Sequence, residues 1–300
     1  MNIDIRKQKE TLIESWEAFE KKIEEVNKFV SYQQLSPIDR TYSRISYPLF
    51  RGQSNTNWKL TTTLDRSVDH AWQCSAYHEN LRIIEKDIAS CLSRQWDLED
   101  WSEQNDFLFS YKPQTYEFMT YLRHHEFPSP LLDWTKSPYI AAFFAFKDLT
   151  FQRNEFAAIF IYLSDLGYGK ASTQGDPCIS CLDLPVRSHK RHFLQQCEYT
   201  ICAQEGKNGL EYGQHEKVFQ KNEQKQDILL KLILSYDLQK SFLDRLKTMN
   251  ISDYVLFNSE ESLMHTLAVK YFLKLKFQDQ KFIIPEAPIS YNSGDMISRL

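Results

Sequence analysis

The chain has 300 residues, of which 42% are hydrophobic and 14% aromatic, so it can bury a large core and does not have the composition of a disordered protein. Its formal net charge is −4 and it has no basic block, so nothing signals broad nucleic-acid binding. No apolar run reaches the roughly 18 residues of a membrane helix, and the first residues lack the apolar stretch of a secretory signal. We therefore expect a cytoplasmic protein without membrane contact, whose six cysteines stay reduced.

The first half of the chain combines helical and extended patterns. Residues 6–31 repeat apolar side chains every three or four positions, which predicts an amphipathic helix that either covers the core or mediates dimerisation. The apolar run 45–50 predicts a buried strand with Arg51 at its end. Further helices are expected at about 75–95, 114–125 and 137–149. The last of these starts at Ser137-Pro138, a helix-start signal, and continues with almost only apolar residues.

In the second half, residues 157–163 form an unbroken apolar run that predicts a central strand. The glycine-containing segment 164–192 is predicted to be a long surface loop, and the polar stretch 205–226 a mobile connection. Strands are expected at about 193–203 and 228–234, and helices at about 237–249 and 259–275. The irregular order of strands and helices favours an α+β fold, a mixed sheet flanked by helices. We expect an N-terminal helical extension (1–40), a main domain (41–276) and an irregular C-terminal tail (277–300).

Two polar segments adjoin these apolar elements. Phe50-Arg51-Gly52-Gln53 closes a predicted strand, and Leu131-Leu132-Asp133-Trp134-Thr135 leads into the apolar helix. With Leu64-Asp65-Arg66 between them, they resemble the FRG domain, a family named for its Phe-Arg-Gly string. The resemblance extends over about residues 45–275. The chain departs from the family pattern at three positions where Gln, Gly and Arg are usual, namely Arg123, Glu126 and Pro130.

The aromatic-Arg-Gly string is also similar to the one that opens the core of ADP-ribosyltransferases of the Arg-Ser-Glu type, so the fold is expected to be ADP-ribosyltransferase-like. The resemblance implies that NAD is the substrate, that no metal is needed, and that a macromolecule accepts ADP-ribose. Cleaving the nicotinamide–ribose bond builds positive charge on the sugar, which a carboxylate stabilises. The residues implied as catalytic are Arg51, Thr135, Gln196 and Glu198, the last two on one face of a strand. Those implied as contacting NAD are Arg51, Gln53, Arg66, His124, Asp133 and Trp134.

Such an enzyme, whether a transferase or an NAD glycohydrolase, is expected to act as a toxin or a phage-defence effector. The alternative is a non-catalytic module that binds a nucleotide or a partner. The cheapest discriminator is whether Glu198 or another carboxylate borders a cavity shared by Arg51 and Thr135.

The residues alone leave simpler roles open. Arg51 and Asp133 can form a buried ion pair that only joins two strand ends. Trp134 can be a core residue rather than a stacking platform. Of the consecutive His124 and His125, one is expected to face inward, as a hydrogen-bonded histidine or as a general base. Cysteines 178 and 181, with His189 and His192, have a spacing that partly fits zinc, although free thiols are the default.

Overall fold

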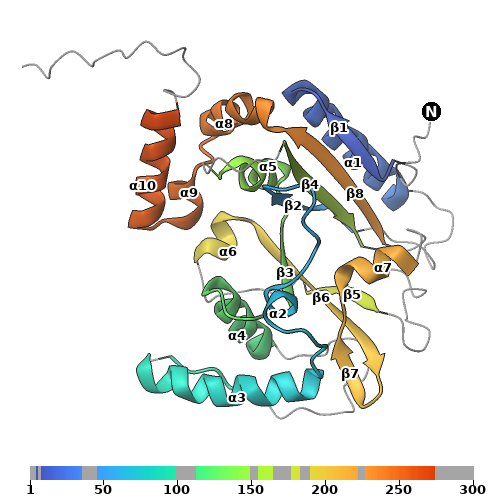
Figure 1. Cartoon of the computed structure of the whole chain (residues 1–300), viewed down its shortest axis with the longest axis vertical. Coiled ribbons are helices and arrows are strands. Elements are labelled where there is room, and N and C mark those ends of the chain that lie inside the picture. Colours follow the sequence, from blue (N-terminus) through green and yellow to red (C-terminus); the bar gives the residue numbers. More distant parts are fainter. Residues whose placement is uncertain are drawn as a thin grey trace, which may run out of the picture.

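The computed structural model describes residues 5, 8–35, 46–92, 94–98, 113–148, 155–164, 177–182, 190–221 and 227–273. In this part of the chain, an eight-stranded mixed sheet is flanked by helices, which confirms the predicted α+β class (Figure 1). The expected tail 277–300 lies outside the described residues.

The strands are ordered β1-β8-β4-β2-β3-β6-β5, with β7 paired to β6. Only β1 and β8 run parallel, and the other neighbours are antiparallel. The strands are β1 (Glu10–Ile13), β2 (Leu49–Gln53), β3 (Leu131–Thr135), β4 (Phe156–Leu163), β5 (Cys178–Cys181), β6 (Cys197–Gly206), β7 (Gly209–Tyr212) and β8 (Ile228–Ser235).

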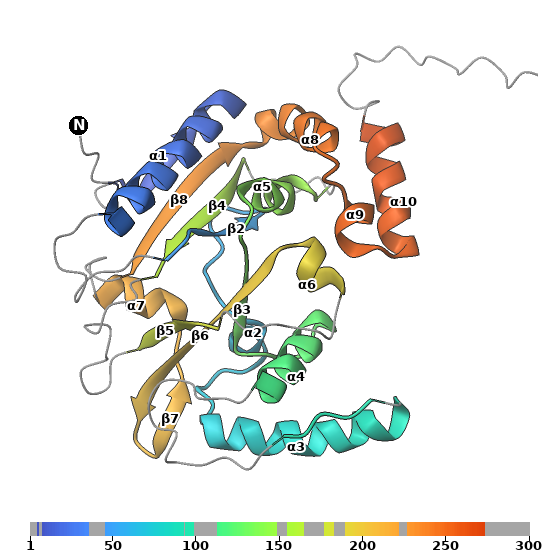
Figure 2. The ribbon, with the colours of Figure 1, turned by 180° about the vertical axis from the view of Figure 1, so that it is seen from behind.

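The sheet has a narrow neck between β2 and β3. These strands are joined by a single register pair, Phe50 with Thr135, whereas β2 pairs with β4 along its whole length and β3 does the same with β6. The neck divides the sheet into a first half, β1-β8-β4-β2, and a second half, β3-β6-β5 with β7. Figure 2 shows the two halves turning away from each other beyond the neck.

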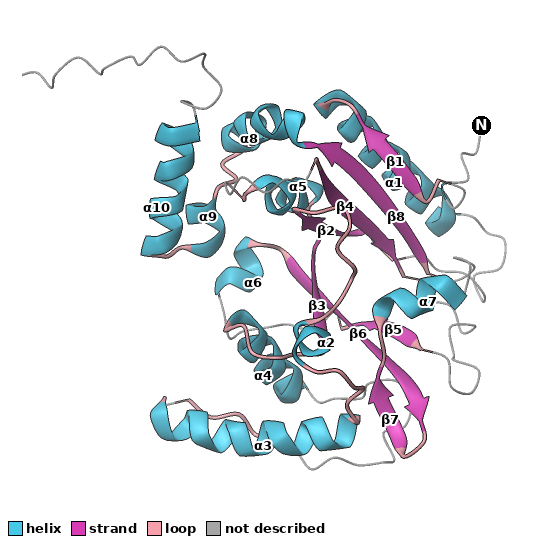
Figure 3. Cartoon of the chain, in the orientation of Figure 1, coloured by secondary structure: helices cyan, strands magenta, loops and turns pink. Residues whose placement is uncertain are grey.

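The helices are α1 (Trp16–Leu35), α2 (Thr63–Ser67), α3 (Cys74–Cys91), α4 (Pro113–His124), α5 (Pro138–Phe146), α6 (Lys190–Leu194), α7 (His215–Lys221), α8 (Gln239–Thr248), α9 (Asp253–Phe257) and α10 (Glu260–Ala268). A 3₁₀ turn, η4 (Tyr236–Leu238), precedes α8, and a π-helical turn, η5 (Val269–Leu273), follows α10. Figure 3 shows how these helices surround the sheet.

Three apolar cores hold these layers together. The largest packs α1, α5 and α8 on one face of the first half of the sheet. A second packs α3 and α4 on the second half. A third lies on the opposite face near the neck and includes Trp134, Tyr162 and, from α7, Val218. The neck is thus supported by side-chain packing from both halves.

The N-terminal segment differs from the prediction of one helix over residues 6–31. Residues Glu10–Ile13 form strand β1, and α1 begins only at Trp16, after Ser15 accepts a hydrogen bond from the Ala18 amide at 3.1 Å. The predicted apolar stripe is buried in the largest core from Trp16 onward, but Leu12 belongs to β1 and is 55% exposed. The predicted helix therefore covers the core, which was the first of the two alternatives stated for it.

Four further segments correct the sequence-based assignments. Arg51 lies inside β2 rather than at a strand end. The predicted loop 164–192 contains strand β5, and the predicted strand 193–203 starts only at Cys197 because α6 and a turn precede it. The stretch 205–226, expected to be a mobile connection, contains β7 and α7. These polar, short elements are fixed by contacts with neighbouring strands that no local pattern reveals.

Helix α5 comes unusually close to β2. The Ser137 hydroxyl accepts a hydrogen bond from the Ile140 amide at 3.3 Å, with Pro138 next in sequence, so the predicted helix start is confirmed. A Cβ atom added at Gly52 would lie 1.9 Å from the Ala141 carbonyl oxygen. Only glycine permits this contact, and the string that contains Arg51 is thereby pressed against the buried helix.

No helix among the described residues is long and apolar enough to cross a membrane.

Candidate functional site

A cavity of about 280 Å³ lies at the neck, where the two halves of the sheet separate. Its wall combines residues of β2, α4, β3, α5, α6 and β6 with the end of α9. The lining residues of interest here are Arg51, Arg123, His124, Glu126, Asp133, Thr135, Phe144, Arg191, Gln195, Cys197, Tyr199 and Phe257. Arg51 and Thr135 therefore share one cavity, and the carboxylates that border it are Asp133 and Glu126, not Glu198.

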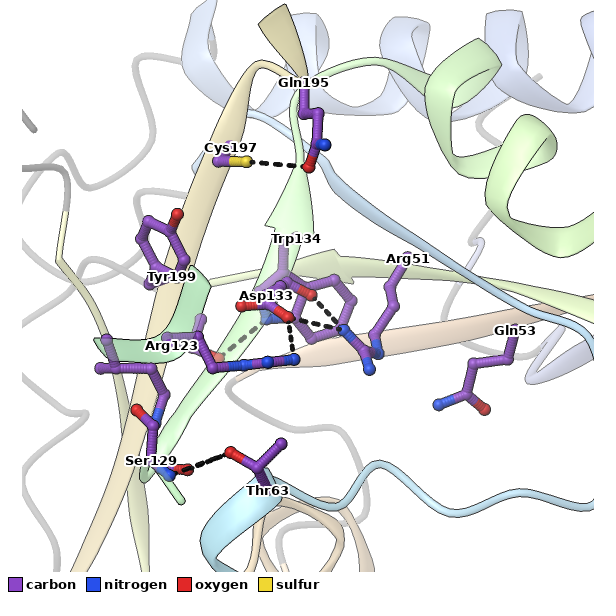
Figure 4. Close-up of polar contacts among 12 residues, drawn as sticks. Arg51, Gln53, Thr63, Arg123, Ser129, Asp133, Trp134, Gln195, Cys197 and Tyr199 are labelled. Atoms are coloured by element: carbon purple, nitrogen blue, oxygen red, sulfur yellow. Dashed lines mark hydrogen bonds and ion pairs between the residues drawn. The ribbon is translucent and has the colours of Figure 1, made fainter. Parts of the chain in front are cut away.

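Asp133 is the centre of this cleft. Its carboxylate lies 2.5 Å from Arg123 Nη2 and 3.8 Å from Arg51 Nη1, and Arg51 also donates a 2.7 Å hydrogen bond to the Asp133 carbonyl oxygen. Figure 4 shows the two guanidinium groups reaching Asp133 from different elements. The expected ion pair of Arg51 with Asp133 is present, but the carboxylate is shared and its closer partner is Arg123.

The local charge of the cleft is positive. Arg51, Arg123 and Arg191 face two carboxylates, Asp133 and Glu126, among the lining residues. Burial lowers the pKa of Arg51 to about 10, and the neighbouring Asp133 carboxylate opposes this shift. Even at that pKa, Arg51 is almost fully protonated at pH 7. The excess positive charge makes the cleft suited to an anionic ligand.

The histidine pair divides as expected. His124 Nε2 lies 3.0 Å from the Tyr199 hydroxyl and lines the cavity, whereas His125 is exposed and packs on the Tyr121 ring. Burial raises the pKa of Tyr199 well above its usual value, and it raises the pKa of the Cys197 thiol to about 12. Neither group is therefore ionised at pH 7, so neither acts as a ready nucleophile.

Thr135 and Gln195 line the cavity and are held in place by hydrogen bonds. The Thr135 hydroxyl donates to the Gln195 carbonyl oxygen at 2.7 Å and accepts from the Ser137 amide at 3.1 Å. The Gln195 side-chain amide donates to the Leu256 carbonyl oxygen at 3.1 Å, which ties the turn before β6 to α9. Both hydrogen bonds of Thr135 are internal, so its hydroxyl fixes the start of α5 against this turn.

The predicted pair of Gln196 and Glu198 is not brought to the cavity. Gln196 lies in the turn before β6 with a left-handed φ of 48°, so it does not share a strand face with Glu198. Glu198 is opposite Trp134 in the β3–β6 ladder, and its carboxylate lies 3.1 Å from Lys136 Nζ. Neither residue is among those that line the cavity. Their catalytic role stays a prediction.

Of the remaining predicted contacts, Trp134 lines the cavity, whereas Gln53 and Arg66 are not among the lining residues. Gln53 is buried and its amide donates to the Lys59 carbonyl oxygen at 3.4 Å. Arg66 is exposed and donates to the Thr61 carbonyl oxygen at 2.8 Å. The Trp134 indole is buried, stacks on Tyr162 and donates to the Thr200 hydroxyl at 2.8 Å, as expected of a core residue.

The structure adds three charged residues that the sequence did not mark as site residues. Arg123 completes the contacts of Asp133, Arg191 lines the cavity with its guanidinium over the Phe257 ring, and Glu126 lines it from just beyond the end of α4. Arg123 and Glu126 are two of the three positions at which the chain departs from the FRG pattern. That departure was the available signal, because a charged residue in place of an uncharged one changes what the cleft can bind.

No group of three or more His, Cys, Asp or Glu side chains in the described part of the chain is arranged to hold a metal ion. Cys178 and Cys181 belong to strand β5, and His189 of the suggested zinc set lies outside the described residues.

The fold and the cleft define an α+β protein with a cavity lined by arginines at the neck of a divided sheet. Residues 46–154 match the family model of the FRG domain, so the chain contains an FRG domain, as the sequence resemblance predicted; the match covers the first part of the expected span 45–275. The match includes Arg51, Arg123, Asp133 and Thr135 and ends before Gln196. No curated protein and no solved structure matches the chain.

Proposed function

We propose that the cleft binds NAD and that the chain cleaves the nicotinamide–ribose bond, passing ADP-ribose to a macromolecule or to water. One observation carries this proposal: Arg51 and Arg123 converge on Asp133 inside a cavity with excess positive charge. Guanidinium groups match the paired oxygens of a diphosphate, which is the most anionic part of NAD.

In the proposed reaction, the protein need not form a covalent bond with the substrate. The bond between C1′ of the ribose and the ring nitrogen of nicotinamide breaks, and its electron pair stays on nicotinamide, which leaves as a neutral molecule. The sugar becomes cationic and is captured by an oxygen nucleophile, which loses a proton. Carboxylates near the sugar stabilise this charge. The carboxylates among the lining residues are Asp133 and Glu126, and we propose that they supply this stabilisation.

Depleting NAD, or inactivating an essential macromolecule by attaching ADP-ribose, would stop cell growth. We therefore propose that the chain acts in the cell as a toxin or a phage-defence effector.

The second candidate is a cleft that binds a nucleotide or a partner without catalysis. It is favoured by the position of Glu198, which pairs with Lys136 and does not line the cavity. It is also favoured by Asp133, whose carboxylate is already engaged by two arginines.

The deciding experiment measures nicotinamide release and label transfer when the purified chain is incubated with labelled NAD, alone and with cell extract. The variants are Arg51→Gln and Glu198→Gln. Arg245→Gln is the matched control, because Arg245 is an exposed surface residue paired with Glu17. We expect Arg51→Gln to lose NAD binding and turnover and Arg245→Gln to retain both. Glu198→Gln tests the catalytic role predicted from the sequence, and it should retain both if the residues that line the cavity do the chemistry.

Each outcome separates the candidates. Binding of NAD without turnover, lost in Arg51→Gln, would establish the non-catalytic alternative. Loss of turnover in Glu198→Gln would return the catalytic role to that residue. No binding of NAD at millimolar concentration would overturn the proposal.

A further inference from the structure

Glu126 occupies a backbone position that glycine fills best. It has a φ of 62° and follows the end of α4. The Phe127 amide donates to the Leu122 carbonyl oxygen at 3.1 Å and the Glu126 amide to the Arg123 carbonyl oxygen at 3.2 Å. This pair of hydrogen bonds is a Schellman-type helix end, in which the left-handed residue is usually glycine because it has no Cβ atom.

The charge of Glu126 is also poorly placed for the helix. The carbonyl groups at the C-terminal end of a helix carry partial negative charge, so a carboxylate there is repelled. The last turn of α4 otherwise follows this rule, since it carries Arg123 and His124. Two independent local costs therefore fall on one side chain, and the local structure gives no compensating benefit.

The side chain borders the arginine-lined cavity. Asp133, the other lining carboxylate, is engaged by Arg51 and Arg123, whereas no ion pair or side-chain hydrogen bond involves the Glu126 carboxylate within the described residues. Glu126 is exposed as well as lining the cavity, which places it at the solvent-facing rim. The cavity thus has a cationic interior around Asp133 and an anionic group at its rim.

We propose that Glu126 is a specificity-determining residue that selects the positively charged pyridinium end of the dinucleotide, while Arg51 and Arg123 hold its phosphates. The inference rests on the proposed function and deepens it. NAD itself has this polarity, with anionic phosphates at its centre and a cationic nicotinamide ring at one end. A carboxylate at the rim attracts that cation, and it repels a ligand that would place a further phosphate at the same position.

The test compares two ligands that the chain cannot cleave. Carba-NAD, in which a methylene replaces the ring oxygen of the nicotinamide ribose, keeps the pyridinium charge, whereas NADH has an uncharged nicotinamide ring. Dissociation constants for both are measured by calorimetry for the native chain and for Glu126→Gln. Glu205→Gln serves as the control, because Glu205 is an exposed residue near the end of β6 remote from Cys197 and the cavity.

We expect Glu126→Gln to weaken the binding of carba-NAD about threefold more than that of NADH, because a partly exposed charge pair contributes about this much. Glu205→Gln should leave the dissociation constants of both ligands unchanged. Equal effects on the two ligands, or none, would overturn the inference while leaving the proposed function intact, provided that Arg51→Gln still abolishes binding. If the native chain binds neither ligand, the proposed function fails and the inference fails with it. Because glutamine keeps the size of the side chain, a folding defect is not expected, and circular dichroism checks this.

Discussion

Arg123, on the last turn of α4, donates to the carboxylate of Asp133 at 2.5 Å. This contact joins the helix to β3, the next strand in the chain, and the two residues are only ten positions apart. Arg51 reaches the same residue from 82 positions away, across the neck of the sheet. Asp133 therefore connects three segments of the chain, namely β2, α4 and its own strand β3. The side chains of Arg51 and Arg123 are only 18% and 17% exposed, so the carboxylate compensates charges that water reaches poorly.

We expect Asp133→Ala to destabilise the fold by about 2 kcal/mol, because it leaves two largely buried guanidinium groups without their counter-charge. The measurement is urea unfolding followed by tryptophan fluorescence. Asp244→Ala is the control: its carboxylate pairs with Lys240 on an exposed helix face, where ion pairs contribute little. An equal loss in the two variants would contradict the role given to Asp133.

Gly52→Ala should destabilise the fold by about 3 kcal/mol or more, since the new methyl group would overlap the Ala141 carbonyl oxygen and approach the Ala145 amide nitrogen to 2.6 Å. Soluble yield and urea unfolding report the effect. In Gly213→Ala the nearest atom is the side-chain sulfur of Cys202, at 3.1 Å, and that variant should lose much less. A Gly52→Ala chain as stable as the native one would show that α5 does not press on β2.

Glu126→Gly should stabilise the fold by about 1 kcal/mol, because glycine adopts a φ of 62° without strain. Glu126→Ala keeps the strained backbone and removes only the repulsion from the helix end, so its gain should be about 0.5 kcal/mol. Urea unfolding midpoints rank the three proteins. A destabilised glycine variant would mean that the side chain contributes packing that outweighs the strain.

The stability of the fold should fall in acid partly through His215. Burial, with the nearby Arg51 charge, lowers the pKa of His215 to about 3, against 6.5 for an ordinary histidine. Below pH 6.5 the unfolded chain therefore binds a proton that the folded chain does not, and stability decreases as the pH falls towards 3. At pH 5 the loss is about 2 kcal/mol.

Unfolding free energies of the native chain and of His215→Gln, measured between pH 7.5 and 4.5, check this prediction. The native curve should fall more steeply below pH 6.5, with a difference in slope approaching one proton. His192, whose pKa burial also lowers, is present in both proteins and cancels in the comparison. Parallel curves would mean that folding does not lower the pKa of His215.

The parts of the fold that the sequence predicts well are those with strong local signals. Helix α5 has its Ser137 cap and an apolar run, and β4 is apolar throughout. Both patterns predict a buried element, which is what the structure shows. The boundary between β1 and α1 was missed because Leu12 continues the helical spacing of Trp16 and Phe19 although it lies in a strand. Pairing with β8, more than 200 residues away, decides its conformation.

The same division holds for the cleft. Arg51, His124, Asp133 and Thr135 were predicted, and all four line one cavity, because charged or polar residues beside apolar elements need a partner or a ligand. The spacing of Gln196 and Glu198 suggested a shared strand face, but the left-handed turn at Gln196 breaks the alternation on which that rule depends. The contact of Arg123 with Asp133 could not be read locally, since it requires the angle between α4 and β3.

The narrow neck separates the chemistry of the cleft from the stability of the sheet. Because Phe50 and Thr135 are the single register pair that joins β2 to β3, the width of the opening is set by side chains and not by a continuous ladder of backbone hydrogen bonds. Substitutions on the rim can therefore change which ligand is accepted while both ladders stay intact. A scaffold of this kind can change the shape and charge of its cleft by exchanging a few side chains at the neck.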